Sequence, residues 1–212
     1  MNPLTYNPQT PADFIGEARN IAGLLVQMVA DSRANKLTPL KLLFNGPPGT
    51  GKSALVAFLQ TTAGIHPKWS TTKTNGTKVN MEAIQEMEDG MHYRDLYGDY
   101  KLFWIDEVDK MGPTQQCRFL STLDDMPGGV IVACTSNCKV KDFEPRFQSR
   151  FQLLEVPAVH AAQIETLLAR FLDGTTAHGA AAIKQIATFA CGNVRQALLD
   201  AKAAMLMAQR PA

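Results

Sequence analysis

One eight-residue segment constrains the fold of this chain more than any other, and it reads Gly46-Pro47-Pro48-Gly49-Thr50-Gly51-Lys52-Ser53. It matches the pattern Gly-x-x-x-x-Gly-Lys-[Ser/Thr] and lies between an apolar run at 40–45 and an amphipathic stretch that begins at Lys52. Glycines allow a tight turn there, so that successive main-chain amides converge on phosphate oxygens at the N-terminus of a helix. The segment therefore predicts a strand, a phosphate-binding loop and a helix, in that order.

The residue types of this loop suit a triphosphate bound with a metal ion. Lys52 would neutralise the β- and γ-phosphates, and the Ser53 hydroxyl would hold Mg²⁺. The alternative, a glycine-rich turn with an exposed lysine, is disfavoured by the flanking strand and helix patterns. The predicted ligands are ATP and Mg²⁺, and the predicted nucleotide contacts in the loop are Pro48, Gly49, Thr50, Gly51, Lys52 and Ser53.

A second polar site follows another apolar run, where Leu102 to Ile105 lead directly into Asp106 and Glu107. In open α/β sheets, ligands bind at the carboxyl ends of the strands, so this pair is expected at the same edge as the phosphate loop. Asp106 can serve the shell of the magnesium ion, and Glu107 can polarise a water for attack on the γ-phosphate. Taken alone, an acidic pair after a strand is more often a solvated turn.

The rest of the chain alternates between strand and helix patterns as far as a strand at 151–156. Before the first strand, Thr10-Pro11-Ala12-Asp13 resembles a helix start, and we expect one amphipathic helix from there to about Ala34. This alternation predicts an α/β fold with a parallel sheet covered by helices on both faces. After Pro157 only helical patterns follow, so we predict an α/β nucleotide-binding domain at 1–156 and a small all-helical domain at 157–212.

Charge and hydropathy give no general indication of a partner. Lysine plus arginine exceed aspartate plus glutamate by one in 212 residues, and the stretch from Glu82 to Asp109 is strongly acidic. Bulk charge therefore does not favour nucleic acid, and any such surface must be local. No apolar run is long enough to span a membrane, and the first residues lack a signal pattern, so we expect a cytoplasmic protein without membrane contact.

Together these motifs resemble the AAA+ ATPases, and within them the clamp-loader-like group. Asp13-Phe14-Ile15-Gly16 is similar to the segment that brackets adenine, which implies nucleotide contacts for Ile15 and Gly16. Cys134-Thr135-Ser136-Asn137 resembles the sensor-1 strand of that family. The resemblance implies that Asn137 orients the attacking water or the γ-phosphate beside Glu107.

Two further segments resemble the family's arginine motifs. Glu144 to Phe151 is similar to the clamp-loader segment whose arginine enters the site of a neighbouring subunit, with phenylalanine in place of cysteine. This implies that Arg150 is a catalytic residue supplied in trans, with Arg146 as the second candidate. Gly192-Asn193-Val194-Arg195 resembles sensor 2, which implies that Val194 and Arg195 contact the nucleotide and that Arg195 couples its state to the helical domain.

The resemblance implies an oligomer of this chain or related AAA+ subunits that hydrolyses Mg-ATP between subunits. The implied work is remodelling of a DNA replication, repair or recombination assembly, with DNA or a DNA-associated protein as partner. Two alternatives stay open, an ATP-gated assembly switch with slow turnover and a protein remodeller. Few residues follow Arg195, so we expect no collar domain of the clamp-loader type.

Overall fold

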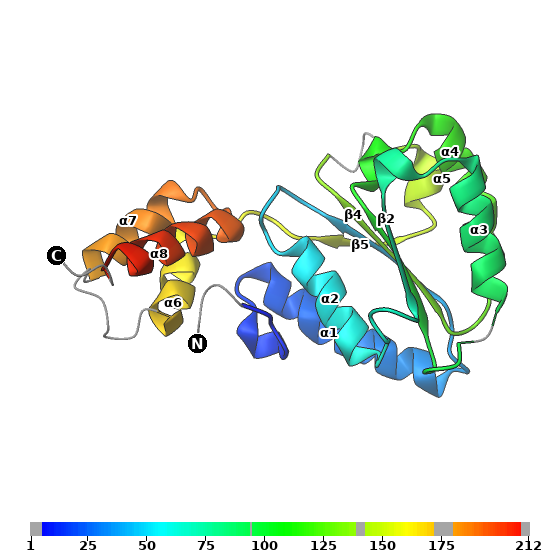
Figure 1. The fold of residues 1–212 in the computed structure, drawn as a ribbon, viewed down its shortest axis with the longest axis horizontal. Helices are drawn as coiled ribbons and strands as arrows, with labels where there is room; N and C mark the ends of the chain where they lie inside the picture. Colours follow the sequence, from blue (N-terminus) through cyan, green and yellow to red (C-terminus); the bar gives the residue numbers. More distant parts are fainter. Residues whose placement is uncertain (1–5, 94, 139–142, 172–179, 209–212) are drawn as a thin grey trace.

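The computed structural model describes residues 6–93, 95–138, 143–171 and 180–208 (Figure 1). Five parallel strands form one sheet in the order β2-β3-β4-β1-β5. Parallel sheets are buried on both faces, which accounts for the continuous apolar runs in the central strands. The strands are β1 (Leu40–Asn45), β2 (Thr71–Asn75), β3 (Lys101–Asp106), β4 (Val130–Ser136) and β5 (Gln152–Glu155).

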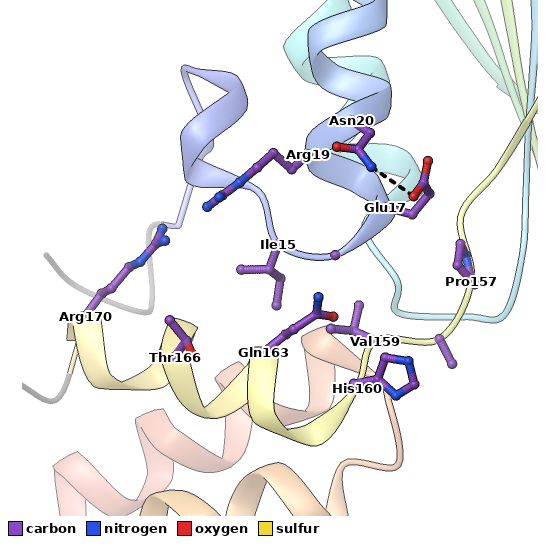
Figure 2. Close-up of a pocket in the computed structure, with 12 residues that line it drawn as sticks. Ile15, Glu17, Arg19, Asn20, Pro157, Val159, His160, Gln163, Thr166 and Arg170 are labelled. Carbon is purple, nitrogen blue, oxygen red and sulfur yellow. Dashed lines mark hydrogen bonds between the residues drawn. The ribbon is translucent and has the colours of Figure 1, made fainter.

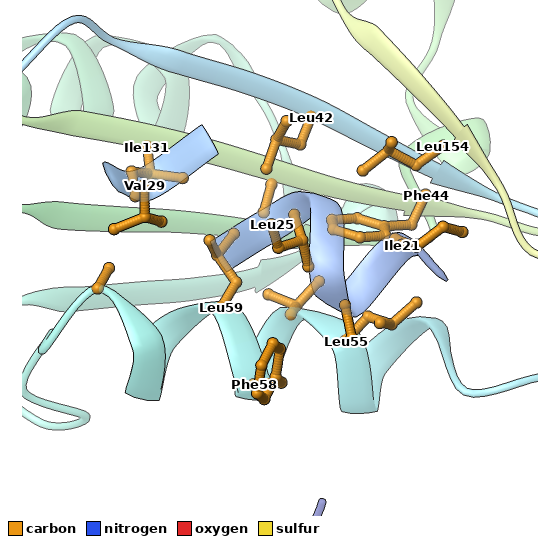
Figure 3. Packing of buried hydrophobic residues seen from close by; sticks show 14 of the residues in the cluster. Ile21, Leu25, Val29, Leu42, Phe44, Leu55, Phe58, Leu59, Ile131 and Leu154 are labelled. Atoms are coloured by element: carbon orange, nitrogen blue, oxygen red, sulfur yellow. The ribbon is translucent and has the colours of Figure 1, made fainter. Parts of the chain in front are cut away.

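Helices cover both faces of this sheet. Helices α1 (Glu17–Ala34) and α2 (Lys52–Thr62) pack on the face that carries Leu42 and Phe44, as Figure 3 shows. Helices α3 (Met81–His92), α4 (Pro113–Asp124) and α5 (Pro145–Gln148) pack on the opposite face, where Leu43 points. Successive side chains of a strand point to opposite faces, so β1 contributes to both cores. The predicted α/β fold is confirmed.

Three more helices follow the last strand, namely α6 (Ala161–Phe171), α7 (Ala180–Phe189) and α8 (Val194–Ala208). They bury a separate apolar cluster and lie at one end of the molecule in Figure 1. Ile15 belongs to the same cluster, and Tyr6 packs against it. The helical region therefore includes contacts from the start of the chain, and a domain boundary at residue 156 stays a prediction.

The predicted helix from Thr10 to Ala34 is wrong in its first part. A single 3₁₀ turn spans Pro11–Asp13, Phe14 is extended, and α1 begins only after Gly16, whose φ is 60°. The reason is that Phe14 packs in the core beside α1 and α2, whereas Ile15 packs among α6–α8. In extended backbone, successive side chains point in opposite directions, which lets Phe14 and Ile15 enter these two different clusters.

Within the described ranges, no helix is both long and apolar enough to cross a membrane.

Candidate nucleotide site

The loop between β1 and α2 passes very close to other parts of the backbone. A Cβ atom on Gly46 would lie 2.0 Å from the carbonyl oxygen of Val156, and one on Gly49 would lie 1.8 Å from Oδ1 of Asn193. The main-chain N–H of Arg195 also donates to the Gly49 carbonyl at 3.1 Å. The loop therefore needs glycine at both positions, and it is joined directly to the start of α8.

Lys52 begins α2 and is buried with its charge directed back toward the loop. Its Nζ donates to the carbonyl oxygens of Gly46 and Pro47, each at 2.7 Å. Burial, followed by the positive charge of Arg195, lowers the pKa of Lys52 to about 8, although the Asp106 carboxylate acts in the opposite direction. The ammonium is thus held beside the loop by neutral acceptors that an anionic oxygen can outcompete.

The acidic pair after β3 is held by side chains at the ends of the neighbouring strands. The Thr135 hydroxyl donates to Oδ1 of Asp106 and accepts the main-chain N–H of Glu107 at 3.1 Å. On the other side, Nδ2 of Asn75 donates to Oε2 of Glu107 at 3.1 Å. Glu107 has φ 52° and ψ 52°, a left-handed conformation that costs a non-glycine residue about 1–2 kcal/mol. Such strain persists where surrounding contacts fix it. Here the hydrogen bonds with Asn75 and Thr135 hold Glu107 in this conformation.

These groups line one small hollow of about 150 Å³, whose lining residues are Pro48, Gly49, Gly51, Lys52, Ser53, Asp106, Glu107, Thr135, Asn137 and Arg195. All but Thr135 were predicted from the sequence. The main-chain N–H of Asn137 donates to Oδ1 of Asp109 at 3.2 Å, which fixes the turn after β4. The hollow is small and mostly polar, which suits phosphate groups and water.

A second hollow of about 290 Å³ adjoins the first and shares Gly49, Gly51, Ser53 and Arg195 with it. Its remaining lining is mostly apolar and consists of Tyr6, Ala54, Val194, Leu198, Leu199 and Lys202. Burial raises the pKa of Tyr6 to about 12, and its hydroxyl donates to the main-chain oxygen of Asp13. The two hollows together present a charged end and an apolar end.

The ATPase family associated with various cellular activities (AAA) matches the chain over residues 42–157, just over half of its length. The chain belongs to this family. The match runs from β1 through β5 and so includes the phosphate loop, the acidic pair and Asn137. Membership of the AAA family indicates an ATPase, and the family predicted from the motifs is confirmed.

Relatives of this AAA chain match it over a larger share of its length than the family model does. Replication-associated recombination protein A of Escherichia coli is 27% identical over 161 residues, which cover 72% of this chain and 35% of that protein. An uncharacterised AAA domain-containing protein of Mycobacterium tuberculosis is 25% identical over 174 residues, which cover 79% of this chain and 37% of that protein. The chain thus spans little more than a third of the length of these two relatives.

Solved structures of other proteins share this fold. A RuvB variant of Thermotoga maritima superimposes with a TM-score of 0.74 at 19% identity, covering 97% of this chain and 68% of RuvB. A DNA polymerase III gamma subunit-related protein of the same organism gives a TM-score of 0.57 at 16% identity, covering 70% of this chain and 49% of that chain. At these identities the likeness establishes the AAA fold alone.

Three residues predicted to contact nucleotide lie outside both hollows of this AAA fold. Ile15 and Gly16 line a separate cavity of about 570 Å³ between the first turn of α1 and α6 (Figure 2). Thr50 is buried, and its hydroxyl donates to the Pro47 carbonyl at 3.0 Å, which shapes the loop from within. Ile15 packs among α6–α8, and nucleotide contacts of Ile15 and Gly16 stay a prediction.

Both candidate arginine fingers of the AAA chain are exposed and lie away from the hollow. Arg150, which follows α5, donates from Nε to Oδ1 of Asp124 at 2.6 Å and from Nη2 to Oδ2 at 3.0 Å. The hydrogen bonds from Arg150 hold the pKa of Asp124 below its usual value, and the carboxylate in turn raises the pKa of Arg150. Arg146 lies on α5, one turn earlier.

Sequence reasoning missed four residues near the site: Tyr6, Asn75, Thr135 and Asn193. Asn75 is the last residue of β2 and Thr135 the next-to-last residue of β4, the two strands that flank β3. Their position at the carboxyl edge of the sheet could have identified them as site residues. Tyr6 gave no signal, because its approach depends on how the chain turns between Asp13 and Glu17.

Proposed function

We propose that this chain binds Mg-ATP at the phosphate loop and hydrolyses it at an interface with a second AAA subunit. The observation that supports this most directly is that one hollow is lined by a buried cation, a serine hydroxyl and two carboxylates, from Lys52, Ser53, Asp106 and Glu107. This is the set of groups that ATP hydrolysis requires: a charge for the phosphates, oxygens for a metal ion and a base for water.

The donor set fits Mg²⁺. The Ser53 hydroxyl and the Asp106 carboxylate are hard oxygen ligands at the edge of the same hollow, and Mg²⁺ prefers one or two such groups beside substrate phosphates. When bound, the ion would neutralise charge on the phosphate oxygens. Thr135 would hold Asp106 in place for this contact through its hydroxyl.

The protein groups divide the reaction between binding and water activation. Phosphate oxygens would replace the Gly46 and Pro47 carbonyls as partners of Lys52, because a charged acceptor is the stronger one. Glu107 would then accept a proton from the attacking water, and Asn137 would orient that water. Arg195 would contact the γ-phosphate from the start of α8.

The apolar hollow is the better place for the nucleoside, because it shares its wall with the phosphate hollow. Val194 and Leu198 would pack against the base from α8, and Tyr6 would close the opposite side. Nucleotide contacts by Ile15 and Gly16, which the resemblance implies, remain part of this proposal, and Ile15 would make them from the edge of the helical cluster.

The interface part of the proposal concerns Arg150, whose exposure leaves it accessible to a second copy. An arginine that meets transition-state charge in trans contributes roughly 10³ to 10⁵ in turnover. Turnover per subunit should therefore rise with protein concentration and vanish in Arg150→Ala, while Arg146→Ala retains it. Turnover that is independent of concentration and unchanged in Arg150→Ala refutes the interface.

Water activation is tested separately with Glu107→Gln. This variant should bind Mg-ATP with unchanged affinity and should accumulate as the ATP-bound oligomer, because the cradle remains while the base is lost. A normal hydrolysis rate in Glu107→Gln refutes the assignment of the base. Undetectable turnover of the wild type at every concentration, with tight binding, identifies an ATP-gated switch instead.

The cellular role is proposed from the relatives. Replication-associated recombination protein A and RuvB, one structure of which is described as a Holliday junction branch migration motor, support a DNA-associated role. We propose remodelling of a replication or recombination assembly. Mass in solution with and without a non-hydrolysable ATP analogue, and with forked DNA in a third arm, tests both assembly and partner. Stimulation of turnover by unfolded protein but not by DNA favours a protein remodeller.

A further inference from the structure

The ion pair between Asp124 and Arg150 joins two segments on the outer side of the α3–α5 layer. Asp124 is the last residue of α4, and Arg150 stands between α5 and β5. Two parallel bonds connect them, from Nε to Oδ1 at 2.6 Å and from Nη2 to Oδ2 at 3.0 Å. Their side chains are 47% and 39% exposed, so the pair lies on the surface rather than in the core.

The geometry of this pair leaves a defined part of the guanidinium free. Arginine carries five N–H donors in a rigid fork. Asp124 takes the Nε donor and one Nη2 donor, and Ser149 Oγ takes one Nη1 donor at 3.2 Å. Within the described residues, one donor on each of Nη1 and Nη2 has no protein acceptor, and these two nitrogens form the outer edge of the fork. That edge matches two oxygens of a phosphate group.

We propose that Asp124 is a positioning residue that holds Arg150 side-on, so that its outer edge is presented to the nucleotide of a neighbouring subunit. This inference rests on the proposed function, because it requires Arg150 to act in trans. Without a partner, the long arginine side chain would sample many rotamers and lose them on contact. With Asp124 in place, the Arg150 side chain is already held in one conformation before the subunits meet. This should increase the rate of reaction rather than the affinity for ATP.

The surface location separates this role from a structural one. Exposed ion pairs contribute little to folding stability, so loss of Asp124 should leave the fold intact. The chain also offers a matched control in Arg118 and Glu88, a second arginine–carboxylate pair that involves α4 and lies on the same layer. Glu88 does not contact Arg150 among the hydrogen bonds of the described residues.

The test compares Asp124→Asn, Asp124→Glu, Glu88→Gln and Arg150→Ala in the full chain. Asparagine has the same shape as aspartate, but its amide N–H₂ group faces an N–H donor of Arg150 and cannot accept a hydrogen bond from it. We expect Asp124→Asn to lower kcat about tenfold, since misplacing an aligned group costs up to 10²-fold. KM for ATP, the thermal midpoint and the concentration that gives half-maximal turnover should stay at wild-type values.

Two further results are expected. Asp124→Glu should recover part of the lost kcat, and Glu88→Gln should match the wild type. The proposal is overturned if Asp124→Asn turns over at or above the wild-type rate, or if Glu88→Gln loses as much kcat as Asp124→Asn. When Arg150→Ala is inactive and Asp124→Asn is normal, only the positioning role is refuted. Wild-type turnover in Arg150→Ala, or none in the wild type, refutes the interface and this inference together.

Discussion

Nδ2 of Asn75 donates a hydrogen bond to Oε2 of Glu107 across 3.1 Å, from the last residue of β2 to the residue after β3. The amide cannot turn freely, because its Oδ1 accepts the main-chain N–H of Thr77 at 3.0 Å and the Thr77 hydroxyl at 2.9 Å. The proposed base is therefore engaged by a fixed neutral donor. A carboxylate in this state has to give up that bond before it can accept from water.

Removing this donor should increase basal hydrolysis. A hydrogen bond to a charged group contributes about 1.5–3 kcal/mol, and giving up part of it in Asn75→Ala should raise turnover about three- to tenfold. Steady-state ATP hydrolysis without DNA measures the effect. Asn80→Ala is the matched control, because Asn80 caps α3 at the Ala83 N–H without touching Glu107. A lower rate in Asn75→Ala would mean that Asn75 aligns Glu107 rather than restrains it.

The Thr135 hydroxyl should be required by both acidic residues, because it bonds the Asp106 carboxylate and the Glu107 main-chain N–H. Thr135→Val keeps the shape of this buried residue but leaves the Asp106 oxygen and the Glu107 N–H without their partner, at about 1–3 kcal/mol of folding stability. We expect a lower thermal midpoint and a loss of turnover at wild-type ATP affinity. Thr135→Ser, which retains the hydroxyl, should stay close to the wild type. Equal behaviour of the serine and valine variants would show that the hydroxyl is dispensable.

Nucleotide affinity should fall as the pH rises through about 8, the pKa to which burial lowers Lys52. The phosphates favour the ammonium form, so binding takes up a proton wherever the free protein has lost it. From pH 7 to pH 9 the Kd of Mg-ATP should therefore increase about tenfold, because the protonated fraction falls by that factor. Calorimetric titration at several pH values measures it. Lys52→Arg, whose guanidinium stays charged, should show a flat profile, and a flat profile in the wild type contradicts the prediction.

Alanine substitutions at Gly46 and Gly49, where the phosphate loop lies closest to other groups, should differ in how they can be compensated. Both Gly46→Ala and Gly49→Ala strain a positive φ, at about 1–3 kcal/mol each. The Cβ atom meets the Val156 main-chain oxygen in the first variant and the Asn193 side chain in the second. Asn193→Ala should lower the thermal midpoint on its own, because Asn193 accepts from the Gln196 N–H, but should raise it in the Gly49→Ala background. It should give no such recovery with Gly46→Ala.

Much of the site could be predicted because parallel strands bring their carboxyl ends to one edge. The loop after β1, the pair after β3 and Asn137 after β4 lie far apart in the sequence, yet strand register alone places them together. The sequence therefore identified the charged end of the site without knowledge of side-chain positions. It could not identify the hydrogen bonds of Thr135, since a threonine at the end of a strand ordinarily reflects β-propensity.

The start of the chain could not be predicted for a different reason. Thr10 to Asp13 carries a helix-start pattern, and Asp13 does accept from the Thr10 N–H at 2.8 Å. Whether the helix continues depends on where Phe14 and Ile15 are buried, and they enter two different apolar clusters. The tertiary packing of these two side chains therefore overrides the local helix pattern. Ile15 and Gly16 line the cavity beside α6, while Tyr6 lines the apolar hollow.

The chain crosses between the sheet and the three C-terminal helices at 14–16 and again at 156–160, and the two crossings are neighbours. A Cβ atom on Gly16 would lie within 3.6–3.7 Å of both methyl groups of Val159. The hydrogen bond from the Arg195 N–H to the Gly49 carbonyl adds a third tie, between the start of α8 and the phosphate loop. A rearrangement of that loop would therefore be felt at once in the last helix, because no flexible linker lies between them.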